Sequence, residues 1–234
     1  MLTLSTINEI LSEEYNSGQA TERKRRSDKQ LDVYTGVIEP YVRQELEKFY
    51  VNNDDFIVLA FANICQRVVN QLAKLYAKAP QRTFKNVTDT QASYLTLLYS
   101  KMKMDDAFLK LNQIFKLSSQ AHLQVVPTLD DKGLKMISAS VLYNQNIDVA
   151  QSPVNPEIAE GYGLSAKQVR YFRIDPNGED ELLNIDSSQE LMTVWTRDFN
   201  YILDVKGKTI LSKNIINPLG LIPIVEISGQ KYGG

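Results

Sequence analysis

The chain has 234 residues, a formal net charge of −2, 43% hydrophobic and 23% charged residues, and a single cysteine. This length suits one large domain or two small ones with a buried core, and the near-neutral charge argues against a protein that coats nucleic acid by electrostatics alone. Cys65 has no cysteine partner, and its apolar surroundings predict a buried thiol. The absence of a long apolar run and of signal-peptide features predicts a cytoplasmic protein without a membrane span.

The first part of the chain has helical periodicity. Ser5 or Thr6 is a candidate N-cap for a short first helix. A longer polar helix is predicted from Thr21, and Pro40 separates it from a further helical piece.

The stretch from Asn63 to Phe84, NICQRVVNQLAKLYAKAPQRTF, is predicted to contain one well-formed helix. Ile64, Val68 and Leu72 recur every four residues, which predicts one buried apolar face. An aspartate at position 68 or 72 is therefore expected to unfold or aggregate the protein.

Two more helices are predicted before the middle of the chain. Asp89 is the candidate cap of the first, whose core side would carry Ala92, Leu95, Leu98 and Tyr99. Asp105 or Asp106 begins the second, with these residues at helical spacing: Phe108, Leu111, Ile114 and Phe115.

From about Ala121 the pattern changes to short segments rich in β-branched and aromatic residues. They are AHLQVVP, GLKMISASVLY, QVRYFRI, ELMTVWT, FNYILDV, KTILS and LIPIVEI. Tight turns separate them at 130–133, 175–178 and 206–208, which favours antiparallel pairing. The stretch 144–166 is predicted to be a long loop or a short helix flanked by loops. The sequence therefore predicts an α+β protein, with a helical region at 1–120 and a mostly antiparallel β region at 121–234 packed as one unit.

No residue pattern indicates catalysis, a cofactor or a metal. His122 is the only histidine, so triads and multi-histidine metal sites lack partners, and a structural role is favoured. The acidic pairs at 54–55, 105–106 and 130–131 occupy cap or turn positions. EGYGL lacks the rest of a dinucleotide fingerprint, and PNGEDE lacks the ligand pattern of a calcium loop.

Basic residues are the candidates for contact with a partner. Five of them lie within two helical turns, but acidic residues interrupt the run and no aromatic residues are interleaved for base stacking. A solvated helix face or a protein contact is therefore favoured over DNA binding. The possible subunit or DNA contacts are Arg23, Lys24, Arg25, Arg26, Lys29, Arg82 and Lys85.

Three segments resemble the portal proteins of tailed bacteriophages. In that family a helix that begins with an asparagine is followed by a proline and then by basic residues. The matching residues here are Asn63, Ile64, Val68, Val69, Ala73, Tyr76 and Pro80. The following segment, YSKMKMDDAFLKLNQIFKLSSQAHLQVVP, is similar to the family's next helix and first strand. NPLGLIPIVEISGQ resembles the run that closes the wing sheet, with matches at Asn217, Pro218, Gly220, Ile222, Pro223 and Val225.

The resemblance covers 61–229 and implies the wing region of a portal subunit, without the family's stem and clip, in a truncated or naturally shortened form. It implies a structural protein with no enzymatic activity and no cofactor, located in the virion and assembled in the host cytoplasm. The implied partners are copies of itself in a dodecameric ring, capsid, terminase and tail adaptor proteins, and double-stranded DNA that passes through without sequence specificity. The basic run from Arg23 to Lys29 and the acidic turn from Glu179 to Glu181 are candidate opposite faces of such a ring. The chain alone is expected to be monomeric or weakly associating, and an extended chain to close into the ring.

Three alternatives remain open at this stage. One is another virion structural protein, such as a minor head protein or an adaptor, which need not form a ring. The second is a small metal- or nucleotide-dependent enzyme built on the acidic turns. The third is a DNA-binding regulator that uses Arg23 to Lys29, which salt-dependent duplex binding would reveal.

Overall fold

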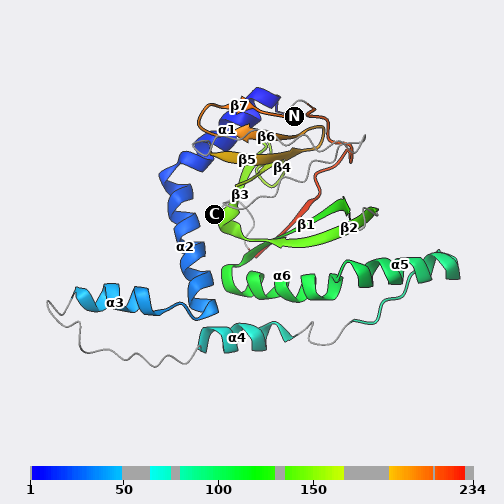
Figure 1. Ribbon diagram of the computed structural model, residues 1–234, viewed down its shortest axis with the longest axis horizontal. Helices are drawn as coiled ribbons and strands as arrows, with labels where there is room; N and C mark the ends of the chain where they lie inside the picture. The colour runs from blue at the N-terminus through cyan, green and yellow to red at the C-terminus, as the bar shows by residue number, and fades with distance from the viewer. Residues whose placement is uncertain are drawn as a thin grey trace.

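The computed structural model describes residues 2–48, 64–74, 80–129, 135–165, 190–212 and 214–229 (Figure 1). The helices precede the strands, as predicted, and the α+β class is confirmed. The predicted strand QVRYFRI, the turns at 130–133 and 175–178, the acidic pair at 54–55 and the acidic turn at 179–181 lie outside the described residues.

The helices are α1 (Leu4–Asn16), α2 (Gly18–Thr35), α3 (Glu39–Glu47), α4 (Ile64–Leu72), α5 (Asp89–Lys101), α6 (Met104–Ser118) and the short 3-10 helix η2 (Asn144–Asn146). The strands are β1 (Gln120–Leu129), β2 (Lys135–Leu142), β3 (Ile147–Gln151), β4 (Ala159–Leu164), β5 (Leu191–Thr196), β6 (Asn200–Asp204), β7 (Thr209–Ile210) and β8 (Ile224–Ser228).

The described strands form two antiparallel sheets, one in the order β2-β1-β8 and the other in the order β3-β4-β5-β6-β7. Helix α1 packs on the outer face of the five-stranded sheet, and α6 packs on the outer face of the three-stranded sheet (Figure 1). A third apolar cluster, which includes Tyr162, Trp195 and Ile224, fills the space between the sheets. The layers are therefore helix, sheet, sheet and helix, and α2 runs along one side of them.

The alternation of residues along β1 produces this layering. Ala121, Leu123 and Val125 contact the α6 side, whereas Val126 contributes to the cluster between the sheets. Successive side chains of a strand point to opposite faces, so a central strand with apolar residues on both faces is covered on both. The predicted turn at 206–208 is confirmed as the connection between β6 and β7.

The prediction for 144–166 was wrong, because this stretch forms η2 and the β3–β4 hairpin. The two glycines of EGYGL permit close packing in β4. A Cβ atom at Gly161 would lie 3.2 Å from Cγ2 of Ile7, and one at Gly163 would lie 2.1 Å from Sδ of Met192. Glycine in a strand can mark such a close approach as well as a turn.

The helix starts lie slightly upstream of the predicted caps. Thr3 caps α1, and Thr88 caps α5 in a capping box with Gln91. Helix α6 begins after Lys103, whose φ of 49° places it in the left-handed region, and the two predicted aspartates fall in its first turn. Carboxylates there still stabilise the helix through its dipole.

Candidate subunit interface

Helix α4 buries a different face from the one predicted. Val69 and Ala73 are 6% and 0% exposed, whereas Ile64, Val68 and Leu72 are 66%, 50% and 59% exposed. Adjacent residues of an α-helix are rotated by about 100° around its axis, so these three residues lie beside the contact rather than in it. The prediction of a buried face at Ile64, Val68 and Leu72 is therefore wrong for the single chain.

Polar contacts fix the rotation of α4. Oδ1 of Asn70 accepts hydrogen bonds from the Tyr34 hydroxyl of α2 and from Nε2 of Gln113 of α6, both at 3.0 Å. Nδ2 of Asn112 donates to the carbonyl oxygen of Ala73 at 3.3 Å. These contacts hold Val69 and Ala73 inward and direct the larger apolar residues outward.

We call Ile64, Val68 and Leu72 the α4 stripe. Full burial of a valine, leucine or isoleucine side chain contributes about 1.5–3 kcal/mol, so three half-exposed ones leave a substantial apolar surface in water. On helix α5, the next helix along the chain, Tyr94 and Leu97 are also 63% and 53% exposed. Exposed apolar surface of this kind is typical of protein–protein contacts.

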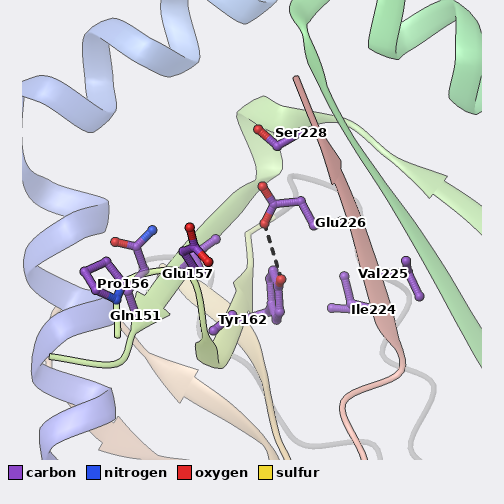
Figure 2. A pocket seen from close by; sticks show the side chains of 10 residues that line it. Gln151, Pro156, Glu157, Tyr162, Ile224, Val225, Glu226 and Ser228 are labelled. Atoms are coloured by element: carbon purple, nitrogen blue, oxygen red, sulfur yellow. Dashed lines mark hydrogen bonds between the residues drawn. The ribbon is translucent and has the colours of Figure 1, made fainter. Parts of the chain in front are cut away.

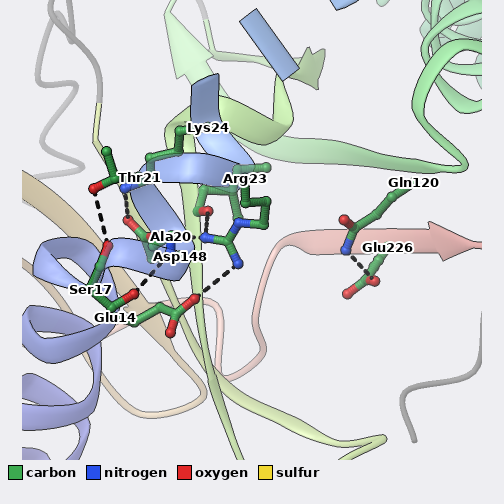
Figure 3. Close-up of polar contacts among 10 residues, drawn as sticks. Glu14, Ser17, Ala20, Thr21, Arg23, Lys24, Gln120, Asp148 and Glu226 are labelled. Carbon is green, nitrogen blue, oxygen red and sulfur yellow. Dashed lines mark hydrogen bonds and ion pairs between the residues drawn. The ribbon is translucent and has the colours of Figure 1, made fainter. Parts of the chain in front are cut away.

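Two of the basic residues predicted as contacts lie against the five-stranded sheet. Asp148 of β3 is fully buried, and its two carboxylate oxygens accept from Nη2 of Arg23 at 2.9 Å and from Nζ of Lys24 at 2.8 Å (Figure 3). Arg23 also donates to Oε1 of Glu14 at 3.0 Å, and Nζ of Lys24 lies 4.2 Å from the centre of the Tyr15 ring. These two cations therefore attach α2 to α1 and β3, which corrects the expectation of a solvated face for them.

Burial raises the pKa of Asp148, and the hydrogen bond from Lys24 opposes that rise. A buried carboxylate is destabilising unless it is paired and hydrogen-bonded. Nothing in the sequence pattern had singled out Asp148, because it falls in the stretch 144–166 that was predicted to be mainly a loop, where aspartate is common.

The other predicted basic residues lie on the surface in two separate places. Arg25 pairs with Glu22 at 2.8 Å, and that hydrogen bond lowers the pKa of Glu22. Arg26 is exposed, and Nζ of Lys29 lies 5.2 Å from the centre of the Tyr41 ring.

Arg82 belongs to the second place, near the start of α6. It donates to Asp105, lowering the pKa of that carboxyl group, and lies 4.9 Å from the centre of the Tyr99 ring. Lys85 is exposed nearby in the chain. The seven residues thus do not form one site, and their contact with another subunit or with DNA stays a prediction.

A buried polar cluster joins the two sheets. His122 is 1% exposed; its Nδ1 lies 3.2 Å from Oδ1 of Asn144, and its Nε2 lies 3.7 Å from Oε2 of Glu226. The Tyr162 hydroxyl donates to the same glutamate oxygen at 3.4 Å, beside a cavity of about 400 Å³ next to β8 (Figure 2). Burial raises the pKa of Tyr162. Among the described residues, no group of three or more histidine, cysteine or acidic side chains is placed to hold a metal ion.

The portal-like run at 217–223 forms a structured turn between the sheets. Nδ2 of Asn217 donates to the carbonyl oxygens of Thr196, Arg197 and Leu221 at 2.8, 3.1 and 2.8 Å, and its Oδ1 accepts from the Leu219 amide at 3.0 Å. Gly220 has a φ of 62°, a left-handed conformation that favours glycine. The asparagine and glycine of this motif therefore guide the chain from the five-stranded sheet into β8.

No protein-family model matches the chain, and no curated protein matches it. Within the described ranges, no helix has the length and apolar character needed to cross a membrane.

Proposed function

We propose that this chain is a structural subunit of a tailed-phage portal, the ring at the capsid vertex through which DNA is packaged and ejected and to which the tail attaches. The observation that supports this most is the α4 stripe. It is exposed in the single chain, and it lies in the segment that resembles the portal helix. In a ring, each subunit contacts two neighbours through different surfaces, so a subunit viewed alone is expected to expose apolar residues.

Other features agree with a role in assembly. Asn217 and Gly220, two residues of the third portal-like segment, have defined structural roles in a turn. The near-neutral charge suits a wall along which DNA moves without being held, because each additional phosphate contact would retard it. The partners of the proposed subunit are copies of itself, capsid, terminase and tail adaptor proteins, and its location is the virion.

The α4 stripe would equally suit another virion structural protein, and the stoichiometry of assembly separates the two. We would express these 234 residues and the complete reading frame that encodes them, and examine both by sedimentation velocity and negative-stain electron microscopy. A portal subunit is expected to form closed rings as the product of the complete reading frame. Monomers of that product under all salt conditions, or assemblies without rotational symmetry, would contradict the proposal.

A matched pair of variants tests the role of the α4 stripe directly. Leu72→Asp places a charge on the stripe, whereas Gln71→Asp makes the same charge change at an exposed polar position of the same helix. We expect both variants to fold, and only Leu72→Asp to lose ring assembly, because an unpaired carboxylate cannot be buried at an interface without a large penalty. Equal assembly of both variants would show that the stripe is not in the interface.

A further inference from the structure

The outer edge of β2 is a second surface that could bind another chain. Among the described strands, β1 lies between β8 and β2, so β2 is an edge strand of the three-stranded sheet (Figure 1). It has eight residues, from Lys135 to Leu142, which is long for an edge strand. Natural proteins usually shorten, cover or pair such an edge.

The register shows which backbone groups point outward. The Val125 amide donates to the carbonyl oxygen of Pro223, and the Gly229 amide donates to that of Ser119, both at 2.9 Å. Residues of an antiparallel strand alternate between the two sides, so Val125 and the residues two positions away along β1 bond toward β8. The β2 residues opposite them therefore turn their backbone groups away from β1.

These outward-facing residues are Ile137, Ala139 and Val141, which are aligned with Pro127, Val125 and Leu123. The register takes their amide and carbonyl groups out of the β1–β2 ladder, and no backbone hydrogen bond outside the ladders of the described residues involves them. Three N–H donors and three C=O acceptors thus form a regular row along this edge. An extended chain could pair with them without displacing any hydrogen bond among the described residues.

A groove of about 660 Å³ runs between this edge and the junction of α5 and α6. Ala107, Met136 and Ile137 contribute apolar surface to it. Three lysines and one acidic residue supply its charged groups: Lys101, Lys103, Lys110 and Asp106. All four of these charged residues are exposed, so the net charge of the groove is positive.

The helix junction positions these lysines. Lys101 ends α5, and Lys103, in its left-handed conformation, separates α5 from α6. Nζ of Lys110 lies 4.9 Å from the centre of the Tyr143 ring, which holds its chain beside the sheet. The wall opposite the free strand edge is therefore cationic.

We propose that this groove binds an extended acidic segment of another protein, which adds to the sheet as a strand alongside β2. Main-chain hydrogen bonds would supply the pairing, and carboxylates on alternate residues would meet the lysines. Pairing of β2 with β2 of a second copy is disfavoured because it would bring two lysine-lined grooves together. Single-stranded nucleic acid is disfavoured because no aromatic residue lines the groove for base stacking.

This proposal is independent of ring assembly and is tested with a synthetic probe. The probe is a fluorescein-labelled octapeptide of alternating glutamate and valine, and its fluorescence anisotropy is measured as the protein is added. We expect saturable binding that weakens as salt is raised, and no comparable binding of the same peptide with lysine in place of glutamate. Absence of saturable binding, or equal binding of both peptides, would overturn the proposal. Tighter binding of a labelled oligothymidine than of the acidic peptide would also overturn it.

Charge-reversal variants locate the site. Lys103→Glu combined with Lys110→Glu is expected to weaken peptide binding by at least about tenfold, a loss of about 1.4 kcal/mol. Lys116→Glu is the control, because Lys116 is exposed on the same helix but does not line the groove. Equal loss in the control, or no loss in the double variant, would place the peptide elsewhere.

The backbone part of the proposal needs its own readout. Amide hydrogen exchange at Ile137, Ala139 and Val141 should be fast in the free protein and slow when the peptide is bound. Ile137→Pro should abolish binding, because it removes an outward N–H group without removing a bond to β1. Unchanged exchange at all three amides would overturn strand addition, whether or not the proline variant folds. A dimer of the free protein that Ile137→Pro dissociates would identify a second copy as the occupant instead.

Discussion

The ion pairs of Asp148 lead to a quantitative prediction for Lys24→Met. The variant keeps the length of the side chain but removes the ammonium group 2.8 Å from Oδ2 of a fully buried carboxylate. Removing one partner of a buried ion pair costs about 3–5 kcal/mol. Arg23 still contacts the other oxygen at 2.9 Å, so we expect a smaller loss of about 2–3 kcal/mol in the free energy of unfolding.

This loss should be visible in thermal and urea unfolding followed by circular dichroism. For a chain of this size each kcal/mol lowers Tm by about 2–4 °C, which gives a decrease of about 4–12 °C. Arg26→Met is the matched control, because it removes a cation from an exposed position of the same helix. Its effect on the free energy of unfolding should stay within about 0.5 kcal/mol.

The dependence on pH distinguishes a charge effect from a packing effect. Burial raises the pKa of Asp148, and Lys24 opposes this, so the pKa should rise further in Lys24→Met. A carboxyl group whose pKa is higher in the folded state binds protons more readily there, so the stability it contributes is present at low pH and is lost as pH rises through the folded pKa. The deficit of the variant relative to the wild type should therefore narrow as pH is lowered from neutrality. A deficit that is constant with pH, or a Tm equal to that of the wild type, would refute this reasoning.

Three further predictions concern the sheets and the turn between them. Asn217→Ala should lower the free energy of unfolding in urea by about 2–3 kcal/mol, because it leaves several backbone groups of the turn unbonded; an effect no larger than that of a surface change would contradict this. Gly163→Ala should be destabilising by about 1–3 kcal/mol through overlap with Met192, and adding Met192→Ala should recover part of the loss; no recovery would mean that the close approach is not the cause. Burial raises the pKa of Tyr162 and Tyr201, so the stability that these phenols contribute is present below their unfolded pKa of about 10 and is lost above it. Absorbance at 295 nm should show their ionisation only together with unfolding, and ionisation of every tyrosine near pH 10 with unchanged circular dichroism would contradict this.

The sequence was a good guide where one local pattern determines the structure. The apolar spacing of α6 predicted the burial of Leu111 and Ile114, and the short segment rich in β-branched residues at β1 predicted a strand. Helix α4 was identified, but its rotation depends on hydrogen bonds of Asn70 to two other helices, which no local pattern contains. For the same reason, Ile64 was predicted to lie on the buried face of α4, and that prediction was wrong.

The parts of the candidate surfaces that could not be predicted all depend on distant segments. Asp148 is paired with residues of α2 that are more than a hundred positions away in the chain, and Gly163 is required by a neighbouring strand. The cationic groove combines Lys103 of the α5–α6 junction with the edge of β2. A basic run such as Arg23 to Lys29 is easy to find in a sequence. The acidic partners of its first residues can be identified only in the folded chain.

The position of β8 has a consequence for the synthesis of this protein. Gln120 and Glu226 are hydrogen-bonded although 106 positions separate them, so β1 leaves the ribosome long before its second neighbour exists. At about 5–20 residues per second, this interval lasts roughly 5–20 s. During that time α6 and the β1–β2 hairpin can form, because their contacts are local, but the cluster between the sheets lacks Ile224. The nascent chain thus exposes the β8-facing edge of β1 and part of the cluster between the sheets until the turn at Asn217 positions β8. Binding by a chaperone would protect the chain most during this period.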